Sequence, residues 1–423
     1  MHRRERCHAD TASHRVSRID RAPIVFSCLG HLYVHFCTAF YFVIVLALER
    51  DWGRPFHELI ELWTLGSLLV GLAALPAGLL GDRIGSARMM AVFFVGMGAG
   101  SGAASLSSST ESMMVSLAAI GLFASIYHPV GIPWLVRHAR TRPGKSLGVN
   151  GIFGSAGSAL AGIVSGSLVD LAGWRVAFLV PGLVCVATGA LLFTFLATGR
   201  IRDERPAPRT DSLEPSADGR RVVGILLVTM FLAGLVFHAT QTSLPKLFEQ
   251  RHGGLVEEGA FGIGLLVALV YGAAGVMQIM GGHLADRYPL KPVYLGAILL
   301  QVPLLWVAAS ISGLPLVVVA TLMVMANAGA LPAENMLLAR HTPERRHGLF
   351  FGVKFVMTFG AAPLAVALVS AVSGRTGELH WLYVLLSSFA LAAFVIAAFL
   401  PSSRRAPLTE PLLVPTIKET TQT

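Results

Sequence analysis

The sequence GLLGDRIGSAR, residues 78–88, lies between two long apolar runs. A related sequence, GHLADRYPLK, occupies residues 282–291 and holds the same position relative to its own flanking runs. A motif that returns after about half a chain length indicates two homologous halves. The matching positions are Gly78 with Gly282, Asp82 with Asp286, and Arg83 with Arg287.

Shorter matches support the same repeat. Residues 148–150, Gly-Val-Asn, correspond to residues 352–354, Gly-Val-Lys, at the same spacing. With a shift of one residue, His35 aligns with His238. The chain is therefore expected to consist of two diverged copies of one unit.

The composition is that of a membrane protein. Hydrophobic residues make up 54% of the 423 residues and charged residues only 13%, whereas roughly a quarter of a soluble domain is charged. Spanning a bilayer takes about 20 apolar residues per helix, and twelve such runs are present. We expect an all-α integral membrane protein with twelve transmembrane helices in a lipid bilayer.

The basic residues indicate an orientation in the membrane and exclude nucleic acid as a partner. The net charge of +9 is spread between the apolar runs and is not gathered in one arm or face. Most of the 33 Lys and Arg residues fall on one side if both termini and the central linker are cytoplasmic, as the positive-inside rule requires. We predict a multi-pass protein of a bacterial-type inner (plasma) membrane with both termini cytoplasmic.

A polar segment divides the apolar runs into two sets of six. Residues 199–221 carry three prolines and many charges, which is typical of a flexible linker. The predicted organisation is a cytoplasmic tail at residues 1–21, a six-helix bundle at residues 22–198, the cytoplasmic linker at residues 199–221, a second six-helix bundle at residues 222–400 and a cytoplasmic tail at residues 401–423.

Two six-helix halves, the long linker and the motif G-x-x-x-D-R-x-G-x-x-R at residues 78–88 resemble the major facilitator superfamily over nearly the whole chain. The resemblance implies two pseudo-symmetric six-helix bundles with a substrate site near the midplane between them. In that family the motif is a cytoplasmic gate. Its aspartate packs near a helix end of the other half and helps to hold the cytoplasmic side shut.

Carried over to this chain, the gate falls on both copies of the motif. Asp82 takes the packing role, since a carboxylate near a helix N-terminus is favoured by the helix dipole. The glycines permit close approach and the arginines complete the charge relay. In the first copy these residues are Gly78, Arg83, Gly85 and Arg88. The second copy carries Gly282, Asp286 and Arg287 and has Pro289 where the first copy has Gly85.

Residues 125–162, SIYHPVGIPWLVRHARTRPGKSLGVNGIFGSAGSALAG, resemble the fosmidomycin-resistance type of drug exporter within that superfamily. The resemblance implies export of a small organic molecule. Two positions depart from the antiporter pattern: Ser158 follows Gly157 in place of proline, and Arg137 lies at the cytoplasmic end of the fourth span.

Glycines recur in the predicted fifth span. Small residues let helix backbones approach closely, which is a common packing device in membranes. The same spacing also suits a helix that rocks against its neighbour. These glycines are Gly148, Gly151, Gly154, Gly157, Gly162 and Gly166.

Ionisable side chains inside the spans are the strongest site candidates, because each costs roughly 2.5–3.5 kcal/mol in hydrocarbon unless it finds a partner or water. Glu334 and Lys354 fall in the tenth and eleventh spans, each about 9 Å from the cytoplasmic end. We expect them to meet as a buried pair, joined by Asn335 and, from the other half, by Asn150. Such a pair is either a static lock between helices or a substrate or proton site whose charges separate during transport.

Histidines form a second group of candidates. His31 and His35 lie one helical turn apart near the middle of the first span and share a face. They are open to three interpretations: proton coupling, since imidazole titrates near neutral pH, a metal-binding pair, or neutral residues in helix packing. His238 favours a site, because the first and seventh spans line the central cavity in the family that this chain resembles. His128, beside Pro129, belongs either to such a site or to a structural bend.

The remaining polar residues of the spans are amides and one carboxylate. Gln241, Gln278 and Asn327 are expected to make hydrogen bonds between helices, and the two glutamines could also orient a polar substrate. Glu61 lies near the outer surface in the second span. It is an outer gate, a proton acceptor or a side chain exposed at the membrane edge.

The leading hypothesis is a secondary active transporter that works by alternating access and exports a small organic molecule or drug in exchange for protons. The sequence contains no nucleotide-binding loop, so an ion gradient is the expected energy source. The alternatives are a proton-coupled importer of a small metabolite or metal chelate, a membrane di-iron enzyme built on the histidine pair, and a sensor without transport. We expect a monomer with no cofactor, and no cysteine–histidine zinc spacing is present.

Overall fold

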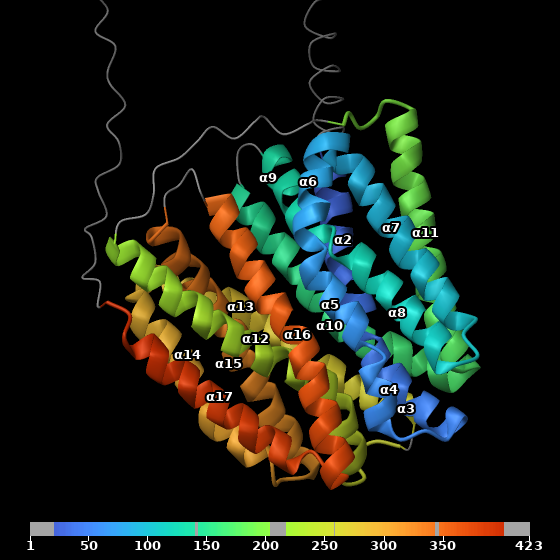
Figure 1. Ribbon diagram of the computed structural model, residues 1–423, viewed down its shortest axis with the longest axis vertical. Coiled ribbons are helices and arrows are strands. Elements are labelled where there is room, and N and C mark those ends of the chain that lie inside the picture. Colours follow the sequence, from blue (N-terminus) through green and yellow to red (C-terminus); the bar gives the residue numbers. More distant parts are fainter. Residues whose placement is uncertain (1–20, 140–142, 204–216, 258, 343–346, 402–423) are drawn as a thin grey trace, which may run out of the picture.

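Every regular element is a helix in the part of the chain that the computed structural model describes, residues 21–139, 143–203, 217–257, 259–342 and 347–401 (Figure 1). The first half contains α2 (Ala22–Ala39), α3 (Tyr41–Trp52), α4 (Phe56–Glu61), α5 (Thr64–Leu72), α6 (Ala74–Ile84), α7 (Ser86–Ser105), α8 (Thr110–Ala124), the π-helix η1 (Tyr127–Gly131), α9 (Ile132–His138), α10 (Pro143–Ala172) and α11 (Trp174–Ala197). The second half contains α12 (Ala217–Arg251), α13 (Ala260–Arg287), α14 (Leu290–Ala308), α15 (Gly313–Arg340), α16 (His347–Thr376) and α17 (His380–Ala398).

These helices confirm the predicted membrane fold. Eleven stretches are long and apolar enough to cross a membrane, or twelve if the bent pair Phe56–Leu72 and Ala74–Ile84, which meet at 49°, counts as one span. α12 begins at Ala217, so it takes in the last residues of the predicted linker. Linker residues 204–216 and the predicted tails at residues 1–20 and 402–423 lie outside the described residues.

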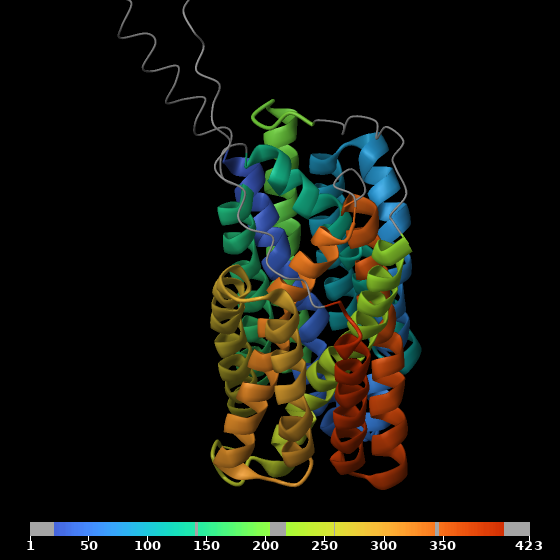
Figure 2. The same cartoon turned by 90° about the vertical axis from the view of Figure 1, so that its left-hand side faces the viewer.

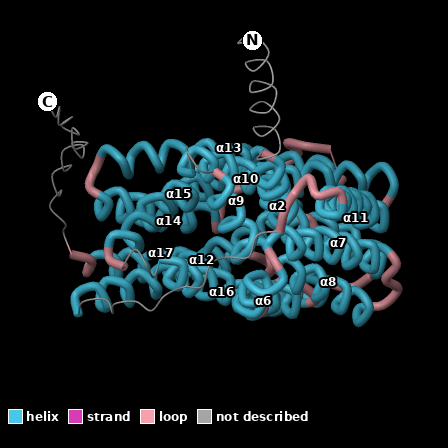
Figure 3. The backbone as a smooth tube through the Cα atoms, turned by 90° about the horizontal axis from the view of Figure 1, so that it is seen from above, coloured by secondary structure: helices cyan, strands magenta, loops and turns pink. Residues whose placement is uncertain are grey.

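Two groups of helices lie side by side. Seen from above, the helices of residues 22–197 (the N half) occupy one side and those of residues 217–398 (the C half) the other (Figure 3). The long helices run roughly parallel (Figure 2). α6 and α9 lie at one end of the bundle and α3 and α4 at the other (Figure 1). We name these the Asp82 end and the Glu49 end, after residues on α6 and α3.

Glycine and proline set the breaks between and within the helices. Gly85 separates α6 from α7 with a φ of 102°, which side chains with a Cβ rarely adopt. Gly53 ends α3 in the left-handed conformation with a φ of 59°. Pro129 has no amide hydrogen to donate, and around it the fourth span takes the π-helical form of η1. His128 therefore lies in this π-helical segment, which is part of the continuous span Thr110–His138.

The halves come closest where α10 crosses α13. A Cβ at Gly162 would lie 2.6 Å from the carbonyl oxygen of Gly264, and Gly166 packs in the same way against Ala260. At Gly148, toward the Asp82 end of α10, a Cβ would meet nothing within 4 Å. Gly154 and Gly157 pack as closely against α2, so close packing is confirmed for these four glycines of the fifth span.

We expect Gly162→Ala to lower the midpoint of thermal unfolding of the purified protein, because overpacking a tight contact costs about 1–3 kcal/mol. The matched control is Gly148→Ala on the same helix, where the new methyl group meets open space. Both substitutions gain the same helix propensity. Equal unfolding midpoints for the two variants would contradict the close approach of α10 and α13.

Candidate functional site

The buried ion pair predicted in the tenth and eleventh spans is present. Lys354 Nζ on α16 lies 2.7 Å from Glu334 Oε1 on α15. The two side chains expose only 7% and 4% of their surface. Lys354 Nζ also donates a hydrogen bond to Asn335 Oδ1 at 2.5 Å, as expected. The contact is confirmed, whereas its role in transport stays a prediction.

Two further helices of the C half complete this polar cluster. The Tyr294 hydroxyl on α14 lies 3.2 Å from Glu334 Oε2 and 3.0 Å from Thr229 Oγ1 on α12, and it can donate to either oxygen. Thr229 Oγ1 in turn donates to the carbonyl oxygen of Leu226. Glu334 is therefore held by an ammonium group and a hydroxyl group inside an otherwise apolar bundle.

The expectation that Asn150 joins this pair is wrong. Asn150 lies on α10 of the N half, where its Oδ1 accepts a hydrogen bond from the Tyr127 hydroxyl at 2.9 Å. Its backbone carbonyl oxygen lies 2.7 Å from His31 Nδ1. The repeat aligns Asn150 with Lys354, yet Asn150 contacts Tyr127 and His31 in the N half, and Lys354 contacts Glu334 in the C half.

Burial makes the Glu334–Lys354 pair sensitive to the loss of either charge. Removing one partner of a buried ion pair costs about 3–5 kcal/mol, because the other charge is left uncompensated in a low dielectric. Protonation of Glu334 would have a similar consequence, since it neutralises the carboxylate and leaves Lys354 charged. The pair can therefore link the protonation of one carboxylate to the packing of α15 against α16.

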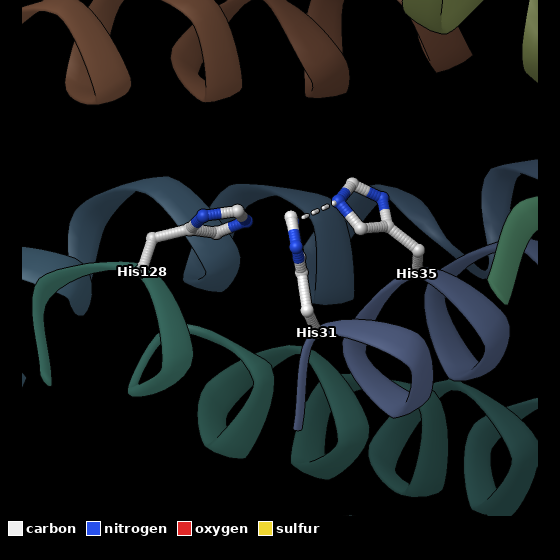
Figure 4. Close-up of side chains that lie close together, drawn as sticks. All are labelled: His31, His35 and His128. Carbon is white, nitrogen blue, oxygen red and sulfur yellow. Dashed lines mark hydrogen bonds between the residues drawn. The ribbon is translucent and has the colours of Figure 1, made fainter. Parts of the chain in front are cut away.

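Three histidines of the N half converge on one point (Figure 4). His31 and His35 project from α2 and His128 from η1. The Nε2 atoms of His31 and His35 are 3.2 Å apart, and one nitrogen of each of the three rings lies within 4.8 Å of the other two. His31 Nδ1 must carry a proton in order to donate to the Asn150 carbonyl oxygen, so in the neutral ring its Nε2 is an acceptor.

Aromatic rings from both halves enclose this histidine cluster. Tyr127 stacks on His31 with ring centroids 5.0 Å apart. Phe355 and Phe359 of α16, in the C half, lie against His128 at centroid distances of 5.1 and 4.9 Å. The cluster therefore lies at the boundary between the halves. His128 Nδ1 is buried and finds no hydrogen-bond partner among the described residues.

His238 and Gln241 on α12 face the same boundary. The His238 ring packs near Phe359 with centroids 5.9 Å apart, and within the described chain its buried Nε2 has no hydrogen-bond partner. Gln241 is buried and lines a small cavity between the halves with Ser158 of α10 and Tyr271 of α13. Both predicted site residues are thus near the centre of the molecule.

Of the three predicted interhelical amide contacts, one is confirmed. Asn327 Nδ2 on α15 lies 3.4 Å from Gln301 Oε1 on α14. In the described ranges neither Gln241 nor Gln278 makes a side-chain hydrogen bond to another helix. These two glutamines are therefore free to turn toward a bound molecule.

The first copy of the gating motif lies at the Asp82 end. Asp82 and Arg83 are exposed, and among the described residues neither makes a hydrogen bond or ion pair. Gly78 packs on Pro129, since a Cβ there would lie 3.2 Å from the proline ring. The expected contact of Asp82 with a helix end of the other half is thus not made by the residues described in this conformation.

Asp203, which follows α11, holds the other end of the motif. Its Oδ1 accepts a hydrogen bond of 3.0 Å from the backbone N–H of Ala87, so the carboxylate caps α7. Arg88 Nε lies 3.5 Å from Asp203 Oδ2. A Cβ at Gly85 would overlap the Asp203 carboxylate, which requires glycine there as firmly as the positive φ does. Gly85 and Arg88 therefore engage a carboxylate at the start of the linker, just after their own half.

The second copy of the motif packs less tightly at the same end. A Cβ at Gly282 would meet nothing within 4 Å, and Asp286 and Arg287 are exposed at the end of α13. Pro289 has a φ of −58°, where the corresponding Gly85 has a φ of 102°. The two turns therefore differ in backbone conformation.

An ion pair joins the two halves at the Glu49 end. Lys246 Nζ on α12 lies 2.7 Å from Glu49 Oε2 on α3 and also 2.7 Å from Glu249 Oε2 on its own helix. The side chains of Lys246 and Glu49 expose 13% and 26% of their surface. Lys246 is therefore shared between a partner in each half.

Hydrogen bonds join the halves at the same end. Ser370 Oγ on α16 lies 2.7 Å from Glu61 Oε1 and 2.9 Å from the carbonyl oxygen of His57. Asp170 at the end of α10 accepts hydrogen bonds from the first two backbone N–H groups of α13, at 2.9 and 2.7 Å. These contacts close the Glu49 end, whereas at the Asp82 end the described polar contacts of the first motif involve only the N half and the start of the linker. Glu61 takes part in these contacts and is at the same time exposed, as one of its three interpretations expected.

Sequence reasoning did not single out Asp203, Lys246 or Asp170. Each lies at or just beyond the end of a predicted span. A charged residue is usually solvated there, so its presence does not indicate a functional site. The only available signal was position, because Lys246, Glu49 and Asp170 all lie near the same membrane face in the predicted topology. Their pairing depends on how the two bundles meet, which no local pattern contains.

Comparison with known proteins adds a family and one curated relative. The sequence profile described as Major Facilitator Superfamily matches residues 27–262 and 254–419. The tetracenomycin C resistance and export protein of Streptomyces glaucescens is 28% identical over 251 residues. That match covers 57% of this chain and 40% of the relative, so it spans less than half of the relative's length.

Solved transporter structures share the fold. A bacterial homologue of the human lysosomal transporter Spinster superposes with a TM-score of 0.67 at 12% identity, over 90% of this chain and 95% of the other. The peptide transporter POT in complex with sulfate gives a TM-score of 0.70 at 17% identity, over 89% and 93% of the two chains. At such low identity the likeness concerns the fold alone.

We expect Glu49→Gln to make the Glu49 end open more often, because it removes the ion pair between the halves. A pair exposed to this extent contributes about 0.2–1 kcal/mol, so the open population rises by up to about fivefold. The readout is the rate at which a thiol reagent modifies Val267→Cys, a position buried beside Gly162, in a cysteine-free background.

The matched control is Glu249→Gln, which removes the partner of Lys246 within the same helix at the same distance of 2.7 Å. Its modification rate should stay close to that of the parent. Equal acceleration in both variants, or none in Glu49→Gln, would contradict a closing role for the Glu49–Lys246 pair.

Proposed function

The chain belongs to the major facilitator superfamily, and from this premise we propose that it exports a small organic molecule in exchange for protons. As a member of that family it is a secondary transporter in a lipid bilayer with a small-molecule substrate. The family consists of transporters and not of enzymes, so the di-iron interpretation of His31 and His35 is set aside. Direction, coupling ion and substrate are parts of the proposal.

Alternating access is supported by the unequal contacts at the two ends. Lys246 with Glu49 and Ser370 with Glu61 join the halves at one end. At the other end Asp82 is exposed and without a described partner. We take this conformation to be open at the Asp82 end, which the positive-inside rule assigns to the cytoplasm. The alternate state would break the first set of contacts and bring Asp82 onto the other half.

Proton coupling rests on the buried Glu334–Lys354 pair, the observation that carries the proposal most directly. A static pair would add little stability over apolar residues of similar volume, so another reason for its presence is needed. A proton delivered to Glu334 releases Lys354 and loosens α15 from α16 without exposing a carboxylate to hydrocarbon. The proton gradient can thereby favour one of the two conformations.

Export is favoured over import by the sequence relationship to a resistance and export protein. Tetracenomycin C is accordingly the first compound to test, and the resemblance of residues 125–162 to fosmidomycin exporters makes fosmidomycin the second. A proton-coupled importer is the runner-up. If the protein exports a drug by antiport, collapse of the proton gradient raises the drug content of cells that make it, and import would lower that content.

We expect Glu334→Gln and Lys354→Ala to lose most transport driven by a pH gradient in proteoliposomes, by more than tenfold, because neither retains a titratable ion pair. Exchange of labelled for unlabelled substrate without a gradient should survive in Glu334→Gln, since it requires alternating access but no net proton movement. Tetracenomycin C and fosmidomycin serve as the first substrates.

The control is Glu58→Gln, which removes a carboxylate from the exposed Arg54–Glu58 pair. It should behave like the parent. If Glu334→Gln and Lys354→Ala both respond to the pH gradient as the parent does, the pair is structural and the coupling site lies elsewhere.

A further inference from the structure

We propose that His31, His35 and His128 form a binding site for a divalent transition-metal ion of the zinc type at the boundary between the two halves. The three residues are the one group of potential ligands that the described chain brings together in this way. They come from two separate segments, α2 and η1. The proposal does not depend on what the protein transports.

The spacing of the ring nitrogens fits a single ion. Two nitrogens bound to one tetrahedral zinc ion at about 2.0–2.1 Å lie about 3.3–3.4 Å apart. The Nε2 atoms of His31 and His35 are already 3.2 Å apart. His128 offers a nitrogen within 4.8 Å of both, so a modest rotation of its ring brings the third ligand to the ion.

A hydrogen bond at Nδ1 leaves the Nε2 atom of His31 available as a metal ligand. A metal-ligating histidine usually donates its other N–H to a carbonyl or carboxylate, which fixes the tautomer. His31 Nδ1 is bonded to the carbonyl oxygen of Asn150, and Asn150 is held by Tyr127. The remaining Nε2 is therefore the basic nitrogen of the ring and points at His35.

The other two histidines can supply neutral nitrogens, and among the described residues the only hydrogen bond given up is the one between His35 and His31. His35 donates from Nε2 to His31 in the metal-free state, and binding requires its proton to move to Nδ1, so the ring stays neutral and no net proton is released. His128 Nδ1 is buried and has no hydrogen-bond partner among the described residues. The His128 ring therefore gives up no hydrogen bond at Nδ1 when it turns toward the ion.

Three imidazoles fill three of the four positions of a tetrahedral ion and leave the fourth open. Because the imidazoles are neutral, they leave the full positive charge of the ion uncompensated. Imidazole ligands suit zinc, cobalt, nickel and copper more than magnesium or calcium. The uncompensated charge favours an anionic donor in the open position. That donor is either hydroxide or an anionic group of the transported molecule, and the latter choice rests on the proposed function.

The experiment is metal binding by the full chain, purified in detergent without a histidine tag. Zinc titration should show one ion per chain, and cobalt loading should give the visible absorption of a tetrahedral nitrogen site. His31→Gln, His35→Gln and His128→Gln should each weaken zinc binding by more than tenfold. His283→Gln, an exposed histidine on α13, is the matched control and should bind like the parent.

Azide added to the cobalt-loaded parent tests the open position and should change the visible spectrum. An unchanged spectrum would overturn the open fourth position. Absence of zinc and cobalt binding by the parent, or equal binding by all four variants, would overturn the site itself. The spectrum of the parent decides the matter even if a variant fails to fold. None of these readouts requires transport, so they stand or fall separately from the proposed function.

Discussion

The membrane interior offers no water to a polar group, so a charged or hydrogen-bonding side chain is costly there unless it finds a partner in the protein. Three groups of such side chains stand out among the described residues. Glu334 and Lys354 pair within the C half, three histidines gather in the N half, and Lys246 with Glu49 bridges the two halves. The first two groups each lie within one half, whereas the third joins the halves. We therefore treat each half as a rigid unit and the contact between the halves as the part that changes.

The boundary is built differently at its two ends. Toward the Glu49 end, Gly162 and Gly264 bring the backbones of α10 and α13 into contact, and ion pairs and hydrogen bonds close the gap. Toward the Asp82 end, the same helix α10 presents Gly148 to open space. One helix therefore carries both a tight and a loose contact surface. Such an arrangement suits two rigid bundles that rock about a central region.

The central region contains the histidine cluster and the phenylalanines of α16. His128 belongs to the π-helix η1 in the N half, yet its ring lies against Phe355 and Phe359 of the C half. Lys354 is one residue from Phe355 on the same helix. A shift of α16 that follows protonation of Glu334 would therefore reach the surface that covers His128. α16 therefore links the Glu334–Lys354 pair to the histidine cluster, although the two share no hydrogen bond within the described residues.

Much of this architecture could be predicted from the sequence, because membrane spans, the duplicated motif and the buried Glu334–Lys354 pair are properties of local pattern and repeat. The convergence of His128 on His31 and His35 could not, since it depends on the π-helical turn around Pro129 and on the packing of two segments far apart in the chain. The placement of Asn150 was mispredicted for a related reason. Alignment of the repeat shows which positions correspond, but each half surrounds them with different side chains.

The contact of Asp203 with the gating motif could not be predicted either, again because it depends on the fold. Asp203 lies at the edge of a charged linker, where one aspartate looks like any other, and only the fold brings it to Gly85 and Arg88. The family motif explained why glycine and arginine stand there. It did not show that their carboxylate would come from the start of the linker.

The central claim, that the two ends open in alternation, is tested most directly by spin-label distances across both ends of one protein in a bilayer. Labels at Arg202 and Arg340 report on the Asp82 end, and labels at Asp51 and Glu257 report on the Glu49 end; all four residues are exposed. The account predicts that a change of pH or addition of a transported compound shortens the first distance while it lengthens the second. Distances that change together, or not at all, would contradict it.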